Sequence, residues 1–246
     1  YLDQLIGRAE VKFDWGKFLF IGSPVKGDSQ MMMRADAPFK TIEDMRTAKE
    51  PAKCGGTGTG GAEYMFLRLL EETFPPLKIN SVLGYPGGPE IDLGIERGEI
   101  QCRSFTVEAF FAREPYHTWR KKGFVRIIVQ TGQARDPRLL DVPTMYEVMD
   151  QQKTPDLARR LARVVLVGGT LGRPMLAPPG VPPERLKILR GAFVKTMKDP
   201  EFLAEIEKRN YELDPTPGEN LEAIVKDVMS QPPAIIERLK TVLVAK

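Results

Sequence analysis

The residues best suited to hold a ligand form a run of glycine and threonine at positions 54–61, read Cys-Gly-Gly-Thr-Gly-Thr-Gly-Gly. The run continues into residues 62–70, whose apolar spacing predicts an amphipathic helix. The first N–H groups of a helix have no partner within it, and the helix dipole places partial positive charge at the same end. The pattern therefore predicts an anion site built from backbone N–H groups and threonine hydroxyls.

The type of anion is narrowed by what the loop lacks. Gly56, Gly58 and Gly61 match G-x-G-x-x-G, but about 20 residues later, where a dinucleotide-binding fold has an acidic residue for the ribose, stands Asn80. Residues 60–62, Gly-Gly-Ala, replace the G-K-[ST] of a P-loop. With no Lys or Arg in the loop to balance a second charge, a carboxylate suits it better than a phosphate. A plain strand-to-helix turn is the alternative without a ligand.

Candidate catalytic residues are scarce. His117 is the only histidine, and no Ser or Cys pattern supplies partners for a triad. No group of residues has the spacing of metal ligands. Several carboxylates share one predicted helix with Arg97 and are typical of a solvated face: Glu90, Asp92, Glu96 and Glu99. The sequence predicts a binding protein without catalytic activity, metal or cofactor.

Composition is that of a soluble globular protein. Of 246 residues, 42% are apolar and 28% charged, and 36 basic against 33 acidic residues give too small an excess to predict nucleic-acid binding. No apolar run approaches the roughly 20 residues that span a bilayer. Cys54 and Cys102 form one bridge or none. The chain begins at Tyr1 without a leader, as expected of an exported protein after processing or of a truncated chain.

The middle of the chain alternates predicted strands and helices, which indicates a parallel sheet covered by helices. The ligand crevice of such a sheet lies beyond the carboxyl ends of its strands. Three loops are expected to share that rim: Thr57–Gly61, Tyr85–Gly88 and Phe105–Thr106.

Helix signals are clear elsewhere. Thr41 is expected to cap a helix whose first turn is acidic, and Thr144 with Glu147 forms a capping-box pattern that opens another helix. The C-terminal quarter is nearly all helix, with a short strand expected at residues 211–213. We expect two lobes, one of residues 1–34 with 172–246 and one of residues 35–171.

The order of these motifs resembles the solute-binding receptors of tripartite tricarboxylate transporters, the TctC or Bug group of periplasmic proteins. The similar segments run from about Tyr1 to Asp227. They are Phe-Lys-Thr-Ile-Glu-Asp-Met at 39–45, Gly-Thr-Gly-Thr-Gly-Gly at 56–61, Tyr-Pro-Gly-Gly-Pro-Glu at 85–90, Arg-Gly-Glu-Ile-Gln at 97–101, Asp-Val-Pro-Thr at 141–144 with Glu147, Leu-Ala-Pro-Pro-Gly-Val-Pro at 176–182, Asp-Pro-Glu at 199–201 and Pro-Thr-Pro-Gly-Glu at 215–219.

The resemblance implies a type II periplasmic-binding-protein-like α/β fold, with two lobes of parallel-rich sheets flanked by helices that close about a hinge. It implies a periplasmic monomer that captures a small organic carboxylate, either a di- or tricarboxylate or an aromatic acid, and delivers it to the membrane permease subunits. Carried over by position, the carboxylate would be held by Thr57, Gly58, Thr59 and Gly60, with Gly61, and the cleft would be lined by Tyr85, Gly87, Phe105 and Thr106.

The chain also departs from this family. Its members open with a βα unit whose loop supplies the other half of the carboxylate grip, and this chain starts beyond that unit. Pro86 stands where a Lys-like residue is usual, and Arg103 lies in an unusual strand. If Arg103 points inward, a second acidic group on the ligand would be favoured. The alternatives are an enzyme that binds a phosphate-bearing cofactor at the glycine loop, and the sensing lobe of a regulator, for which no DNA-binding segment is found.

Overall fold

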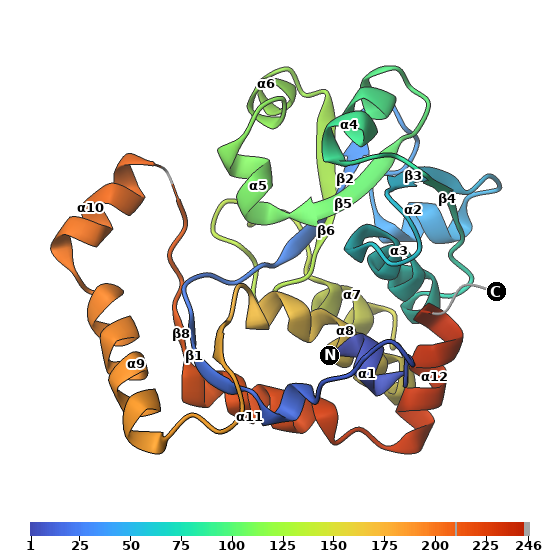
Figure 1. The fold of residues 1–246 in the computed structure, drawn as a ribbon. Helices are drawn as coiled ribbons and strands as arrows, with labels where there is room; N and C mark the ends of the chain where they lie inside the picture. Colours follow the sequence, from blue (N-terminus) through green and yellow to red (C-terminus); the bar gives the residue numbers. More distant parts are fainter. Residues whose placement is uncertain (210, 244–246) are drawn as a thin grey trace. The chain divides into compact units, whose positions relative to one another are not determined.

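The computed structural model describes residues 1–209 and 211–243 of the chain (Figure 1). The chain divides into two units. Unit 1 comprises Tyr1–Gly27 and Val164–Glu237, and unit 2 comprises Asp28–Arg163 and the chain from Arg238 onward.

Unit 2 contains a five-stranded sheet of order β4-β3-β5-β2-β6. Its strands are β2 (Ser29–Arg34), β3 (Ala52–Gly56), β4 (Ile79–Leu83), β5 (Cys102–Thr106) and β6 (Val125–Gln130). Strand β3 is parallel to β4 and β5, whereas β2 is antiparallel to both β5 and β6. The alternation of strands and helices thus gives a parallel-rich sheet, with one antiparallel strand inside it.

Strand β2 belongs to unit 2, whereas the expected division placed it in the lobe of residues 1–34 and 172–246. The expected lobes divided after residue 34, which would leave β2 in the first lobe. In the structure, β2 pairs along both edges, and Met31, Met32 and Met33 are fully buried. Three consecutive apolar residues fit a strand with both faces covered. The boundary of the unit therefore falls before β2, at Asp28.

The helices of unit 2 are α2 (Ile42–Thr47), α3 (Ala62–Thr73), α4 (Gly88–Glu96), α5 (Val107–Ala112), α6 (Tyr116–Lys121) and α7 (Met145–Gln151). Helix α8 (Asp156–Leu171) begins in unit 2 and ends in unit 1, and α12 (Pro233–Leu243) does the reverse. The predicted capping box of Thr144 with Glu147 opens α7, and the predicted cap Thr41 opens α2, where Asp44 completes a second capping box.

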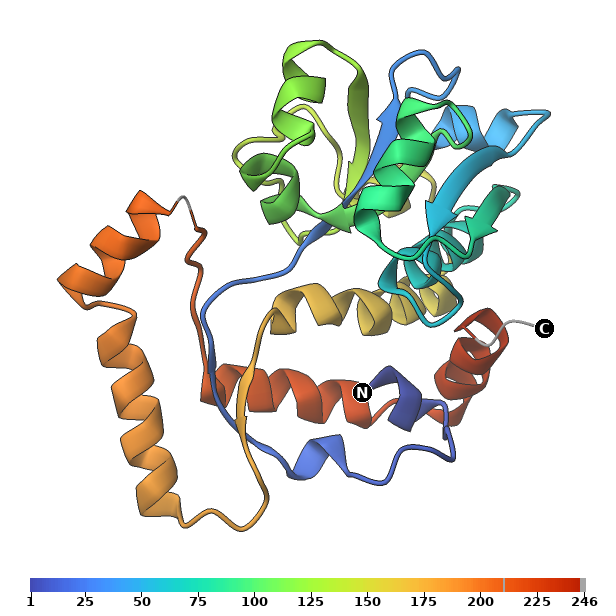
Figure 2. The ribbon, with the colours of Figure 1, turned by 45° about the horizontal axis from the view of Figure 1, so that its top comes forward.

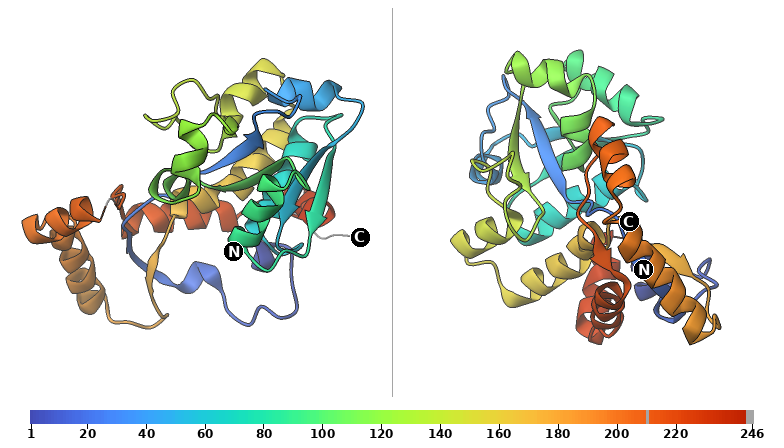
Figure 3. Two further views of the ribbon diagram at one scale, coloured as in Figure 1. Left: turned by 90° about the horizontal axis from the view of Figure 1, so that it is seen from above. Right: turned by 90° about the vertical axis from the view of Figure 1, so that its left-hand side faces the viewer.

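The two faces of the sheet carry different helices. Strand β3 lies between β4 and β5. The connection from β3 to β4 through α3 and the connection from β4 to β5 through α4 therefore run in opposite directions across the sheet. Since such crossovers are right-handed, α3 and α4 lie on opposite faces. Helices α4, α5 and α6 share one apolar cluster, which includes Ile91, Phe110 and Trp119 together with Met32 of the sheet. These green helices can be followed in Figure 3.

Unit 1 is built around β1 (Leu19–Ser23), the middle strand of a three-stranded antiparallel sheet with β7 (Met175–Ala177) and β8 (Thr216–Pro217). Its helices are α1 (Leu2–Leu5), the 3-10 turn η1 (Trp15–Lys17), α9 (Pro183–Thr196), α10 (Pro200–Lys208) and α11 (Gly218–Met229). Helix α11 packs beside β1 (Figure 2) through a core that includes Phe20, Leu221 and Val225. The strand expected at 211–213 was wrong, because pairing with β1 begins only at Thr216.

Within residues 1–209 and 211–243, no helix combines the length and apolar character needed to cross a membrane.

Candidate functional site

The expected ligand loops follow three parallel strands of unit 2. The carboxyl ends of β3, β4 and β5 lie at one edge of the sheet, because β3 is parallel to both neighbours. The loops after these strands, at residues 57–61, 84–87 and 106, therefore lie along the same edge. We call this edge the rim of unit 2.

The order of the strands singles out one point of the rim. The chain leaves β3 for α3 on one face and leaves β5 for α5 on the other face. Neighbouring parallel strands whose connections diverge in this way open a crevice between their carboxyl ends, which is where α/β folds bind ligands. The glycine–threonine loop lies on one side of this point and Thr106 lies on the other.

The loop of residues 57–61 is open to its surroundings. Thr59 and Gly60 are exposed, and the other three residues are half-buried. The N–H of Gly61 donates to the carbonyl of Gly58 at 3.0 Å, which folds the loop into a turn just before α3. Gly61 is the N-cap of α3 and offers no side-chain cap. Within the described chain, no residue accepts a hydrogen bond from the N–H groups of Thr59, Gly60 or Ala62.

The glycines of this segment have two different functions. A Cβ on Gly55 would lie 2.4 Å from Cδ1 of Ile100, so this glycine allows close packing beneath the loop. A Cβ on Gly58 or Gly60 would meet no atom within 4 Å. Neither of the latter has a positive φ, so neither is required by the backbone. They instead leave free space over the unpaired N–H groups, as a ligand would need.

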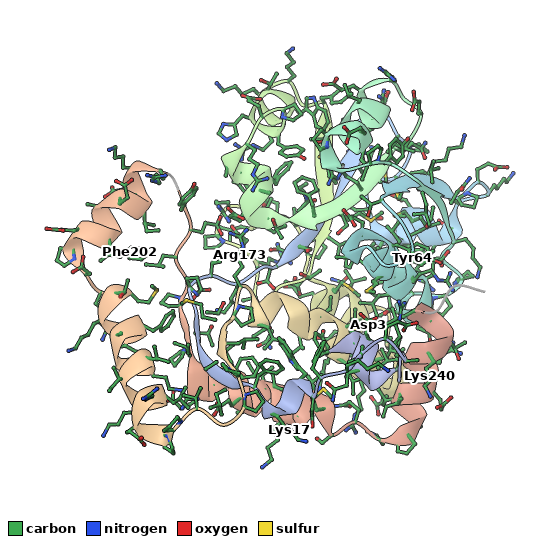
Figure 4. The ribbon with its side chains drawn as sticks, in the orientation of Figure 1. Asp3, Lys17, Tyr64, Arg173, Phe202 and Lys240 are labelled. Carbon is green, nitrogen blue, oxygen red and sulfur yellow. A yellow bond between two sulfur atoms is a disulfide. The ribbon has the colours of Figure 1, made fainter. Side chains whose placement is uncertain are left out.

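Glu63 is the important residue that we did not single out in the sequence. It lies in the first turn of α3, and its Oε2 lies 2.8 Å from the position that a Cβ on Gly61 would take. Tyr64, which Figure 4 labels, follows it on the same turn. A carboxylate here interacts favourably with the positive end of the helix. The Glu63 carboxylate therefore offsets part of the positive potential at the start of α3. The sequence signal that could have identified it is an acidic residue in the first turn of a predicted helix.

Tyr85 and Gly87, on the second loop, occupy different environments. The Tyr85 ring packs over Gly94 of α4 and joins the apolar cluster of that face. Burial raises the pKa of its hydroxyl, and the nearby Glu99 raises it further. Gly87 is the N-cap of α4, again without a side-chain cap. Gly87 thus lies at the rim with its carbonyl accepting a hydrogen bond from the N–H of Ile91, whereas the half-buried Tyr85 ring packs against the apolar cluster.

Phe105 and Thr106 end β5 at the rim. The Phe105 ring stacks on Tyr116 with centroids 4.6 Å apart, and it also contacts Phe110. The Thr106 hydroxyl accepts a hydrogen bond from the N–H of Ala109 and so caps α5. Both residues have structural partners in addition to their place beside the crevice.

Arg103 points onto the helix-covered face rather than over the rim. Its Nη1 donates to Oδ1 of Asp92 at 2.8 Å and to the carbonyl of Gly88 at 2.8 Å. The Tyr116 hydroxyl donates to the other oxygen of Asp92 at 2.7 Å, and burial is the main reason that the pKa of this tyrosine is raised. The guanidinium group also lies over Phe105 at 4.7 Å. The ion pair with Asp92 and the hydrogen bond to Gly88 tie α4 to β5, and thereby connect the elements that carry two of the three rim loops.

Cys54 and Cys102 form a disulfide that joins β3 directly to β5. They face each other in the parallel register, with Cα atoms 4.4 Å apart, and both are fully buried. The covalent link lies below the two strand ends that flank the crevice. The sequence left this pairing open, and the register of the strands decides it.

The structure thus brings all nine expected site residues to or near one edge of a single unit. The backbone of Thr57, Gly58, Thr59, Gly60, Gly61 and Gly87 lies along the rim. The Tyr85 and Phe105 side chains are half-buried and pack against the apolar cluster, and Thr106 is a helix cap. Their contact with a ligand stays a prediction. Among the described residues no three His, Cys, Asp or Glu side chains are grouped so as to hold a metal ion.

The fold has known counterparts, although no protein-family model and no curated protein matches the sequence. A TctC solute-binding protein from Polaromonas superposes over 97% of this chain and 74% of its own, with 18% identity and a TM-score of 0.67. The R. palustris protein Rpa4515, solved with adipate, covers 96% of this chain and 72% of its own at 14% identity and a TM-score of 0.60.

MatC of Rhodopseudomonas palustris, solved with bound malate, is a third counterpart. It covers 97% of this chain and 74% of its own, at 15% identity and a TM-score of 0.56. At these identities the likeness concerns the backbone, and it agrees with the α/β architecture expected from the sequence. The chain has the fold of the TctC-type periplasmic solute-binding proteins.

Proposed function

We propose that this protein is an extracytoplasmic solute-binding receptor that captures a small organic carboxylate at the rim of unit 2. The observation that carries the proposal is the exposed glycine–threonine loop at the start of α3, where the N–H groups of Thr59, Gly60 and Ala62 have no acceptor within the described chain. The likeness to proteins solved with adipate and malate supports this ligand class. A di- or tricarboxylate and an aromatic acid are both compatible with the open loop.

The chemistry of binding follows from the donors that are present. A carboxylate at the loop would accept charge-assisted hydrogen bonds from the N–H groups of Thr59, Gly60 and Ala62, and the helix dipole would favour its charge. Threonine hydroxyls would add further donors. Because no basic side chain belongs to the loop, a singly charged group is held better than a phosphate.

Glu63 sets a condition on this binding. Its carboxylate lies beside the same helix end, so a bound anion has to displace it or tolerate like-charge repulsion. Ligands with contacts beyond the single carboxylate would overcome this cost most readily. Replacing Glu63 by glutamine should tighten binding of any carboxylate, since it removes the repulsion and keeps the size of the side chain.

The location and partners of the protein are part of the proposal. A buried disulfide is expected in an oxidising compartment, which agrees with a periplasmic location. A receptor of this kind acts as a monomer that passes its ligand to membrane permease subunits. Its function is non-catalytic.

Calorimetry with the purified protein tests the proposal. Adipate, malate, citrate and benzoate form the acid panel, and ATP tests binding of a phosphate-bearing ligand. At least one acid should bind with micromolar affinity. Gly60→Asp should weaken that binding at least tenfold, because the new carboxylate enters free space over the loop without a clash. Glu63→Gln should strengthen the binding several-fold.

Gly191→Asp is the matched control, since Gly191 on α9 also has no atom within 4 Å of its Cβ position. It adds the same charge in unit 1 and should leave the affinity unchanged. If no acid gives heat or a thermal shift, the proposal is wrong. If ATP binds and every acid fails, the loop serves a phosphate-bearing ligand instead.

A further inference from the structure

A second cavity in unit 2 has the composition of a ligand site and shares no lining residue with the rim loops. It is an open groove of about 510 Å³ between α5, α6, β6 and the segment that leads to α7. Its apolar floor consists of Phe110, Phe111, Val125, Ile127, Leu139 and Val142. We call it the Phe111 groove. Its volume lies within the range of small-molecule sites, which is about 300–1,000 Å³.

Cationic side chains surround Phe111. The guanidinium carbon of Arg120 lies 4.4 Å from the centre of its ring, and that of Arg138 lies 4.3 Å from it. His117 also lines the groove, and its Nε2 contacts the carbonyl of Phe111. Arginine stacks well on aromatic rings, and such stacking holds the planar group in place while its N–H edges stay free.

Among the described residues that line the groove, Arg120 is the arginine without an ion-pair or hydrogen-bond partner. Within the described chain, its guanidinium forms no ion pair and donates no hydrogen bond, and its Nε is buried without a partner. A buried donor left unpaired is costly, so it calls for an explanation. The other cations differ. Arg138 forms an ion pair with Asp136 at 2.7 Å, and Lys121 lowers the pKa of Glu114, whose main perturbation is a hydrogen bond from the N–H of Thr118.

We propose that the Phe111 groove binds an amphiphilic monocarboxylate, with its apolar body on the phenylalanine and aliphatic floor and its carboxylate on Arg120. The charge of Arg120 is complementary to a single anion, since the neighbouring Arg138 is already neutralised. Burial of apolar surface in the groove would stabilise the apolar body of the ligand, and a charge-assisted hydrogen bond from Arg120 would hold its carboxylate. This site is additional to the rim and does not depend on the function proposed there.

Calorimetry with octanoate, phenylacetate, octanol and octylamine tests the inference. Octanoate or phenylacetate should bind, octanol should bind at least tenfold more weakly than octanoate, and octylamine should give no heat. The two acids distinguish an alkyl from an aryl body. Arg120→Gln should weaken binding of the acid at least tenfold, and rising salt should weaken binding to the native protein.

Arg97→Gln is the matched control, because Arg97 is an exposed arginine on the C-terminal end of α4 and outside the groove. It should leave the affinity for octanoate unchanged, and so should the rim variant Gly60→Asp. Circular dichroism establishes that each variant is folded, and Arg120→Lys gives an intermediate affinity if charge and stacking both contribute.

Three results would overturn the inference. Equal affinity for octanoate and octanol would show an apolar groove that does not recognise an acid. Loss of octanoate binding in Gly60→Asp but not in Arg120→Gln would place the ligand at the rim. Binding of an acidic Glu-Phe-Glu peptide, with no heat from either small acid, would make the groove a protein-docking surface.

Discussion

At the scale of single residues, the glycine–threonine run could be recognised from sequence, but the separate tasks of its glycines could not. Sequence shows that a residue lacks a Cβ, and only the packing around it shows why. Gly55 faces Ile91 and Ile100, whereas Gly60 faces free space. The same holds for Arg103, whose direction the sequence left open and whose partner, Asp92, was expected on a solvated helix face. In the structure both are buried.

This difference predicts opposite outcomes for two similar substitutions. Gly55→Ala would place a Cβ 2.4 Å from Ile100 and 2.8 Å from Ile91, so it should lower the free energy of unfolding by about 1–3 kcal/mol. Gly60→Ala meets no atom and should change it by less than about 0.5 kcal/mol. Urea unfolding followed by circular dichroism measures both. Equal stabilities of the two variants would show that the segment beneath the loop is not packed as described.

At the scale of helices and strands, signals confined to neighbouring residues were the dependable ones. The capping boxes at Thr41 and Thr144 depend on residues three positions apart, and both formed. Pro115, a local signal of the same kind, is the residue at which α6 begins. The short strand was misplaced at 211–213, because its position is set by β1, which is distant in sequence. Strand β2 was assigned to the other lobe because its two partners are also distant.

The cap of α7 predicts a dependence of stability on pH. The Arg135 guanidinium is the main reason that the pKa of Glu147 lies below its ordinary value of 4.5, and the N–H of Thr144 also lowers it. A carboxyl whose pKa is lower in the folded state stabilises the fold above its unfolded pKa, and this contribution is lost as the pH falls through the folded pKa. Glu147→Gln should therefore lower the melting temperature at pH 7.

The difference between Glu147→Gln and the native protein should shrink as the pH falls below the ordinary carboxyl pKa of 4.5 and on through the lower pKa of the folded state. Thermal melts at several pH values check this trend. An undiminished difference at pH 3 would mean that the charge of Glu147 contributes nothing and that only the shape of its side chain matters.

At the scale of the whole chain, the alternation of strands and helices was sufficient to predict the α/β class, the parallel-rich sheet and the shared edge of the three loops. Those features follow from chain direction and right-handed crossovers. The disulfide could not be predicted, because two cysteines 48 residues apart pair only if the strand register aligns them. The boundaries of the units depend in the same way on pairings between distant segments.

Replacing Cys54 and Cys102 together by alanine should lower the free energy of unfolding by about 2–4 kcal/mol, because the bond restricts the unfolded chain over a separation of 48 residues. Denaturant unfolding with and without dithiothreitol measures the effect. The native protein should be destabilised when reductant is present during unfolding, and the double variant should not respond to it. A native protein insensitive to reductant throughout unfolding would show that the bond does not form.

The burial of both sulfur atoms has a practical consequence for studies of motion. A reductant or an alkylating reagent can reach this bond only in molecules whose sheet has separated between β3 and β5. The rate at which reagents reduce or alkylate the cysteines under native conditions therefore measures how often β3 and β5 separate. If a carboxylate bound at the rim holds the two strand ends together, the rate of reduction or alkylation should fall as the fraction of ligand-bound protein rises. This rate would then measure occupancy of the site without a label on the ligand.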